Sequence, residues 1–113
     1  MTLSFQRTSS MQNEIDFKQR AANAIKEEYG QEVWYYLPSD RFRKGVPDII
    51  LCFFGYFVAI ELKMPTSREI EGSAIQKYNL AKIESANGFS FVATDMRSVM
   101  EGLRNILNVI NKA

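Results

Sequence analysis

Two strongly apolar runs, VPDIILCFF and YFVAIELK, stand in the middle of the chain and flank Gly55. Runs rich in β-branched and aromatic residues favour β-strands. Their apolarity is nearly continuous rather than alternating, which is typical of strands covered on both faces. We therefore expect a layered fold built around a buried pair of strands.

The segments around this pair predict the remaining elements. Apolar residues at helical spacing predict helices over 11–29, over 74–87 between Ser73 and Gly88, and from about Ser98, with Ser98 and Glu101 as a capping box. Further strands are predicted over 32–37 and 89–94. Because the last strand-helix-strand step requires a parallel pairing, the sequence predicts an α/β fold with a mixed sheet.

The size of the chain bounds its organisation. With 113 residues, 46% of them apolar, it is expected to form a single domain over 1–113, with residues 1–9 flexible. No apolar stretch approaches the roughly 20 residues that a membrane span needs. The first ten residues also lack the pattern of a signal peptide, so we expect a soluble, intracellular protein.

The absence of histidine excludes several classes of enzyme. Serine-histidine and cysteine-histidine hydrolases and histidine-metal nucleases all need that side chain. One cysteine, Cys52, permits neither an internal disulfide nor a zinc cluster. Acid-base or metal chemistry must therefore rest on oxygen ligands and lysine, which suit a hard cation such as Mg²⁺ or Mn²⁺.

Three polar residues interrupt the apolar runs. If Phe54 and Gly55 form a two-residue hairpin turn, Asp48 lies directly opposite Glu61, with Cβ atoms about 4.5–5.5 Å apart. Lys63 then projects from the same face as Glu61. A longer loop, or a slip of one residue, would instead put the two acids on opposite faces.

A cation would explain why such groups end apolar strands. Burying two carboxylates and an ammonium costs free energy unless they neutralise one another or a metal. Two carboxylates can hold Mg²⁺ against a phosphodiester, while Lys63 orients or helps deprotonate the attacking water. Glu14 falls on or beside the inward face of the first helix and could anchor a metal-bound water or a second cation. The alternatives are a strand-end Asp48, a snorkelling Lys63, and a first-turn acid at Glu14.

The pattern resembles the signature of the PD-(D/E)XK nuclease superfamily, and more narrowly that of the VRR-NUC group. The resemblance rests on a glutamate in the first helix, on the segment GVPD at 45–48, on Glu61 and Lys63, and on Gln76 in the following helix. It covers about Glu14 to Thr94. It implies a restriction-endonuclease-like core and hydrolysis of DNA.

The resemblance also implies roles for individual residues. Asp48 and Glu61 would be metal ligands together with the backbone carbonyl of Leu62, and Lys63 would be the catalytic lysine. Glu14 would be the helical acidic residue, and Gln76 would assist near the site. Asp16, Glu27 and Glu28 lie on the same helix as Glu14, so another acid could take its place.

Basic and aromatic residues suggest further contacts. The formal charge of +1 gives no global attraction to nucleic acid, so local patches must provide it. Arg41, Arg43, Lys44 and Lys77 are candidate phosphate contacts, and the alternative is a solvated loop. Aromatic residues of the strand over 32–37, namely Trp34, Tyr35 and Tyr36, are expected in the core or at an interface rather than stacked on bases.

The expected function is that of a Mg²⁺-dependent endodeoxyribonuclease, selective for branched DNA in the manner of a Holliday junction resolvase. A restriction-like or nicking nuclease and a non-catalytic DNA-binding subunit are the alternatives. A four-way junction needs two cuts, which favours a two-fold homodimer. Its interface would draw on exposed aromatic residues: Trp34, Tyr36, Phe42, Phe53, Phe54, Tyr56 and Phe57. A minimal free nuclease would suit a phage or mobile element, so we expect the protein in the cytoplasm of a bacterial or phage-infected cell.

Overall fold

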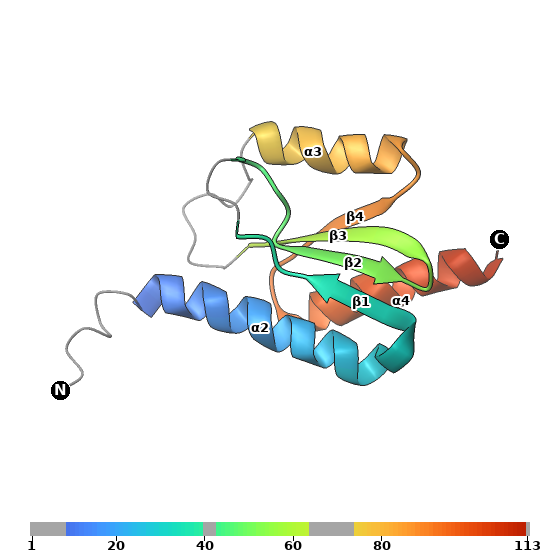
Figure 1. The fold of residues 1–113 in the computed structure, drawn as a ribbon, viewed down its shortest axis with the longest axis horizontal. Helices are drawn as coiled ribbons and strands as arrows, with labels where there is room; N and C mark the ends of the chain where they lie inside the picture. Colours follow the sequence, from blue (N-terminus) through green and yellow to red (C-terminus); the bar gives the residue numbers. More distant parts are fainter. Residues whose placement is uncertain (1–8, 40–42, 64–73, 113) are drawn as a thin grey trace.

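The computed structural model describes residues 9–39, 43–63 and 74–112. Its elements follow the predicted order and form one mixed sheet flanked by helices (Figure 1). The elements are α2 (Ser9–Tyr29), the 3-10 turn η1 (Gly30–Glu32), β1 (Val33–Tyr36), β2 (Ile49–Phe53), β3 (Tyr56–Leu62), α3 (Ala74–Ser85), β4 (Phe89–Ala93) and α4 (Met96–Lys112). The predicted α/β class is confirmed. Residues 1–8, most of the segment expected to be flexible, lie outside the described residues.

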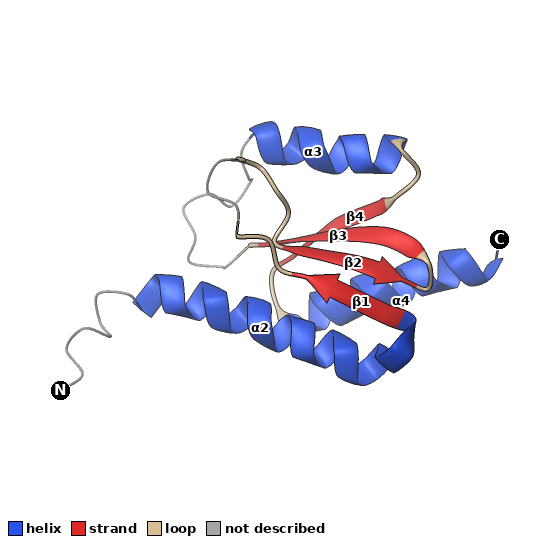
Figure 2. Cartoon of the chain, viewed as in Figure 1, coloured by secondary structure: helices blue, strands red, loops and turns tan. Residues whose placement is uncertain are grey.

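The sheet has the strand order β1-β2-β3-β4. The first three strands are antiparallel neighbours, whereas β3 and β4 are parallel. Helix α3 provides the crossover between the parallel strands and lies on one side of the sheet, while α2 and α4 lie on the other (Figure 2). None of the helices in the described ranges is long and apolar enough to cross a membrane.

The hairpin between β2 and β3 closes through a two-residue turn. Phe53 pairs with Tyr56, and the register continues without interruption to Ile49 and Ile60. Phe54 and Gly55 have φ values of 52° and 83°, as a type I′ turn requires. The predicted turn is therefore confirmed, although phenylalanine rarely adopts this conformation.

The core lies on the face of the sheet that α2 and α4 cover. There, Leu51 and Ile60 pack against Ile25 of α2 and Leu103 of α4, all fully buried. Because apolar residues on these helices recur every three to four positions, each helix presents one buried stripe to the strands. This packing fixes the sheet on which the polar groups at the strand ends are displayed.

The opposite face of the sheet is only partly covered. The prediction that both apolar strands are covered on both faces is right for the second half of β3 but wrong at its start, where Tyr56 and Phe57 are exposed. It is also wrong for part of β2, where Cys52 is exposed and Ile50 is half-buried. Trp34 and Tyr36 are 64% and 52% exposed, so of the two places predicted for them, core or interface, the core is excluded and the interface stays a prediction. Tyr35 packs against the core. Trp34 and Tyr36 stay exposed because α3 is the one described helix on this face, and a helix about 10 Å wide covers only about two strands spaced about 4.8 Å apart.

Two helix ends differ from the prediction. Helix α4 begins at Met96 rather than near Ser98, because Asp95 is the N-cap and accepts a 2.8 Å bond from Ser98 N. The predicted capping box of Ser98 and Glu101 is therefore wrong. Helix α3 ends through Asn87, at φ 75°, and Gly88 N donates to Ile83 O, so asparagine takes the left-handed position.

Candidate functional site

The hairpin brings Asp48 and Glu61 together at its open end. Asp48 directly precedes β2 and Glu61 is the penultimate residue of β3, so the two follow the last registered pair of the hairpin. The backbone N–H of Leu62 donates to Asp48 Oδ2 at 2.8 Å. The backbone N–H of Asp48 in turn donates to the Glu61 carboxylate. The two carboxylates are thus held side by side by the backbone of the opposite strand.

Lys63 and Gln76 complete this cluster from β3 and α3. Lys63 is 8% exposed, and its Nζ lies 3.3 Å from Glu61 Oε2. It also donates to Gln76 Oε1 at 2.8 Å. An amide from the crossover helix therefore fixes the lysine ammonium beside the buried carboxylate.

Burial and like charge act on Glu61. The side chain is 3% exposed, and its pKa is raised to about 7, first by burial and then by the negative charge of Asp48. The ammonium of Lys63 opposes this rise. Lys63 offsets only part of the rise in the pKa of Glu61, and a bound cation would stabilise the charged carboxylate further.

Helix α2 contributes Lys18, which the sequence analysis did not identify. Its Nζ lies 3.9 Å from Asp48 Oδ1. A usable signal was present, because Lys18 follows Glu14 by four residues and so shares its helix face. Glu14 belongs to α2 by its backbone, but its side chain lies outside the described residues.

The loop before Asp48 is tied to helix α3. Asn79 Nδ2 donates to Gly45 O at 2.7 Å, and Gly45 has φ 78°. A Cβ at Gly45 would lie 2.8 Å from Ile75 Cγ2, so only glycine permits this close approach. The contact sets the path of the chain into Pro47 and Asp48. No pattern in the sequence indicates this role of Asn79.

The predicted phosphate-binding residues are spread around this cluster. Arg43 and Lys44 are exposed in the loop before Asp48, and Lys77 is exposed on α3 next to Gln76. Arg41 lies outside the described residues. The contact of these four residues with DNA stays a prediction.

The donor chemistry of the cluster fits a hard divalent cation. The carboxylates of Asp48 and Glu61 lie at the open end of the hairpin. Leu62, which stands between Glu61 and Lys63 in the sequence, has a backbone carbonyl that could be a further oxygen ligand. Within the described ranges, no group of three or more acidic or cysteine side chains comes together, so further ligands would be backbone, water or substrate oxygens. Asp48, Glu61 and Leu62 are therefore the residues that would hold Mg²⁺ or Mn²⁺.

Comparison with known proteins places this arrangement in a known fold. No family model and no curated protein matches the sequence. One solved structure, described as a VRR_NUC domain, is 17% identical over 74% of this chain and 90% of that chain, with a TM-score of 0.56. At that identity the likeness is one of fold, and it agrees with the resemblance drawn from residues 45–63. The chain has the fold of the VRR_NUC domain.

Proposed function

We propose that the protein is a metal-dependent endonuclease that hydrolyses phosphodiester bonds in DNA, with Mg²⁺ or Mn²⁺ as its cofactor. One observation carries the proposal: Asp48, Glu61 and Lys63 meet at the open end of a single hairpin, and the last two are buried. The nuclease-type fold and the family resemblance support the same conclusion.

Each residue of the cluster has a role in this proposal. Asp48 and Glu61 hold the cation, which when bound supplies Lewis-acid stabilisation of the charge that develops on the phosphodiester. An ammonium has three N–H donors, and Lys63 directs them toward Gln76, Glu61 and the attacking water. The oxygen of that water bonds to phosphorus while the bond to the 3′ oxygen breaks, and the proton that the water loses is balanced by the proton that the leaving 3′ oxygen takes up. The products are 5′-phosphate and 3′-hydroxyl ends, as the resemblance implies.

We further propose that the substrate is branched DNA, such as a four-way junction. In the described ranges the helices and strands belong to one layered sheet, and we assign none of them to the reading of base sequence. Selectivity would therefore come from the shape of the DNA, as in a Holliday junction resolvase. A restriction-like or nicking activity is the neighbouring alternative.

A cleavage assay with defined DNA tests this proposal. Linear, flapped and four-way substrates are incubated with Mg²⁺ and with wild-type protein or the variants Asp48→Asn, Glu61→Gln and Lys63→Ala. We expect each variant to lose cleavage, because the substitution removes one charged group of the site. The fold and DNA binding should remain, because the backbone and its packing are unchanged. Glu101→Gln, at an exposed position of α4, is the matched control and should cut normally. Normal turnover by Asp48→Asn would refute the site.

The metal requirement has its own test. Cleavage should stop in EDTA and return with Mg²⁺ or Mn²⁺. Ca²⁺ should support binding but little cutting, because its larger and looser coordination shell positions water poorly. Full activity in EDTA would exclude the metal mechanism, and binding without cleavage under any metal would favour a non-catalytic DNA-binding subunit.

A further inference from the structure

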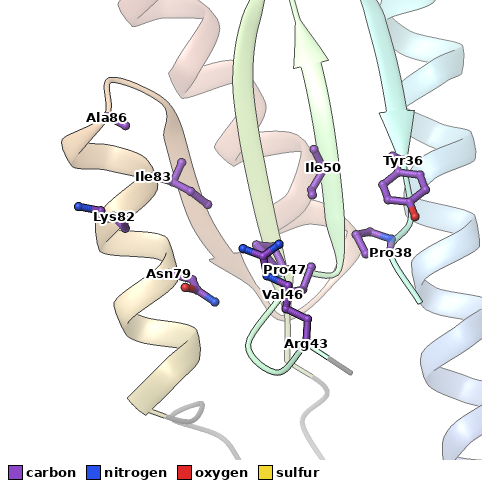
Figure 3. Close-up of a pocket in the computed structure, with 10 residues that line it drawn as sticks. All are labelled: Tyr36, Pro38, Arg43, Val46, Pro47, Ile50, Asn79, Lys82, Ile83 and Ala86. Carbon is purple, nitrogen blue, oxygen red and sulfur yellow. The ribbon is translucent and has the colours of Figure 1, made fainter. Parts of the chain in front are cut away.

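A groove of about 520 Å³ opens beside the candidate site, between the exposed side of β1 and β2 and helix α3 (Figure 3). Figure 3 shows Tyr36 and Pro38 on one side of the groove and Asn79 and Lys82 on the other. The volume falls within the range of about 300–1,000 Å³ that is typical of small-molecule sites. The groove is lined by Tyr36, Pro38, Arg43, Val46, Pro47, Ile50, Asn79, Lys82, Ile83 and Ala86.

The lining combines flat apolar surfaces with positive charge. Tyr36, Ile50 and Ile83 offer one aromatic and two aliphatic surfaces. Arg43 adds a cation within the groove, and Lys82 adds a second at its rim, where Figure 3 shows its nitrogen on the outer side of α3. Among the described lining residues none is acidic. An apolar slot with cationic groups fits a ligand that is planar and carries a phosphate. A nucleotide has both features, since its base can stack on an aromatic ring and its phosphate can meet a cation.

The pairing state of the DNA decides which nucleotide can enter. A base inside a duplex is stacked on both sides and paired at its edge, so its faces are not available to Tyr36. An unpaired base exposes both faces. Trp34 extends the aromatic surface along β1, with its ring stacked on Tyr36 at a centroid distance of 6.4 Å and an interplanar angle of 12°. The surface is therefore suited to a single strand that continues beyond the groove.

The groove is lined by neighbours of two residues of the candidate active site. Pro47 lines it, and the next residue is Asp48. On helix α3, Asn79 lines the groove one turn after Gln76, which is bonded to Lys63. A nucleotide in the groove would thus lie next to the bond that Asp48, Glu61 and Lys63 act on.

We propose that this groove binds an unpaired nucleotide of the DNA substrate beside the scissile phosphate. The proposal rests on the proposed nuclease function and narrows its substrate to DNA with unpaired bases at the cut, such as a flap, a gap or a strained junction. The groove, and not base sequence, then selects the cleavage position. A free mononucleotide has the same base and phosphate and could also occupy the groove, so the test compares it with a DNA strand.

Binding is measured in EDTA, so that the result does not depend on cleavage. Trp34 is the single tryptophan of the chain and stacks on Tyr36, so its fluorescence reports occupancy directly. The probes are a short thymidine oligonucleotide, a blunt duplex of equal length, and thymidine monophosphate as competitor. We expect the oligonucleotide to quench Trp34 and to bind more tightly than the duplex, with little competition by the mononucleotide.

Variants assign the effect to the groove. Tyr36→Ala should weaken oligonucleotide binding about tenfold, the loss expected for one base stack, whereas Tyr36→Phe should retain it. Tyr78→Ala, at an exposed tyrosine of α3 outside the lining, is the matched control. Lys82→Ala is a second variant, which leaves the sheet unchanged and should lower both the affinity and its salt dependence.

The outcomes separate the groove from the nuclease proposal. Three results would each overturn the groove proposal. The first is that Tyr36→Ala binds the oligonucleotide as tightly as Tyr78→Ala and that Lys82→Ala also keeps its affinity. The second is a preference for the duplex, and the third is full displacement of the oligonucleotide by the mononucleotide. None of these results bears on cleavage. Conversely, loss of oligonucleotide binding in Tyr36→Ala would support the groove even if no DNA were cut with Mg²⁺. The absence of cutting would contradict only the nuclease proposal.

Discussion

At the scale of single residues, Glu61 shows how the site opposes the stability of the fold. Its carboxylate is buried beside Asp48, and burial raises its pKa to about 7. The folded protein therefore holds a proton that the unfolded chain releases at a lower pH. The raised pKa stabilises the metal-free fold in acid, and this contribution is lost as the pH rises from the ordinary glutamate range through about 7.

Urea unfolding in EDTA tests this consequence. The free energy of unfolding of the wild-type protein should fall between about pH 4.5 and pH 7, because the folded state binds more protons than the unfolded state. Glu61→Gln removes the titrating group and should flatten this dependence. Glu101→Gln, whose carboxyl is exposed, should keep the wild-type slope. An unchanged slope in Glu61→Gln would show that other groups dominate the pH dependence.

At the scale of elements, the packing of α4 on β4 depends on Gly102. A Cβ built at this position would lie 2.3 Å from Phe91 Cε2, far inside contact distance. Gly102→Ala should gain up to about 1 kcal/mol in helix propensity but lose about 1–3 kcal/mol to overpacking. We therefore expect a net loss of stability in denaturant unfolding. In the double variant Gly102→Ala/Phe91→Leu the loss of stability should be smaller, because the smaller leucine leaves room for the added methyl group. A Gly102→Ala variant more stable than the wild type would contradict the close contact between Gly102 and Phe91.

The elements also show what the sequence could predict. The turn at Phe54 and Gly55 followed from the two apolar runs, and with it the placement of Asp48 opposite Glu61. The exposure of Trp34 and Tyr36 on β1 could not be predicted from the sequence, because it depends on which strands the crossover helix α3 covers. The contact of Lys18 with Asp48 depends on the approach of α2 to the sheet end, which no local pattern specifies.

At the scale of the whole molecule, exposed aromatic residues remain at the hairpin end. Tyr56 and Phe57 are 40% and 45% exposed, as the predicted dimer surface requires. Phe54 is half-buried, so its place at that surface stays a prediction, whereas Phe53 is fully buried and its assignment there is wrong. The reason is the alternation of the strand, which turns Phe53 toward the helices. Phe42, also assigned to that surface, lies outside the described residues.

We still predict a two-fold homodimer, since one site per chain must cut a four-way junction twice. Sedimentation equilibrium at micromolar concentration should give twice the chain mass, and Phe57→Lys should give a monomer. Tyr78→Lys, at another exposed aromatic, should leave the dimer unchanged. A wild-type monomer that cuts both strands of a junction in one binding event would exclude the dimer.

The tight turn at Phe54 and Gly55 lies at the far end of the hairpin from Asp48 and Glu61, about 17 Å away for a strand the length of β2. Because side chains alternate along a strand, one residue inserted within either strand beside this turn, with the turn itself kept, would turn the rest of that strand over relative to its neighbour. A single inserted codon in the gene could thus abolish the site while every residue of the nuclease signature stayed in the translated sequence. A gene catalogued as active by its signature alone would then encode an inactive protein.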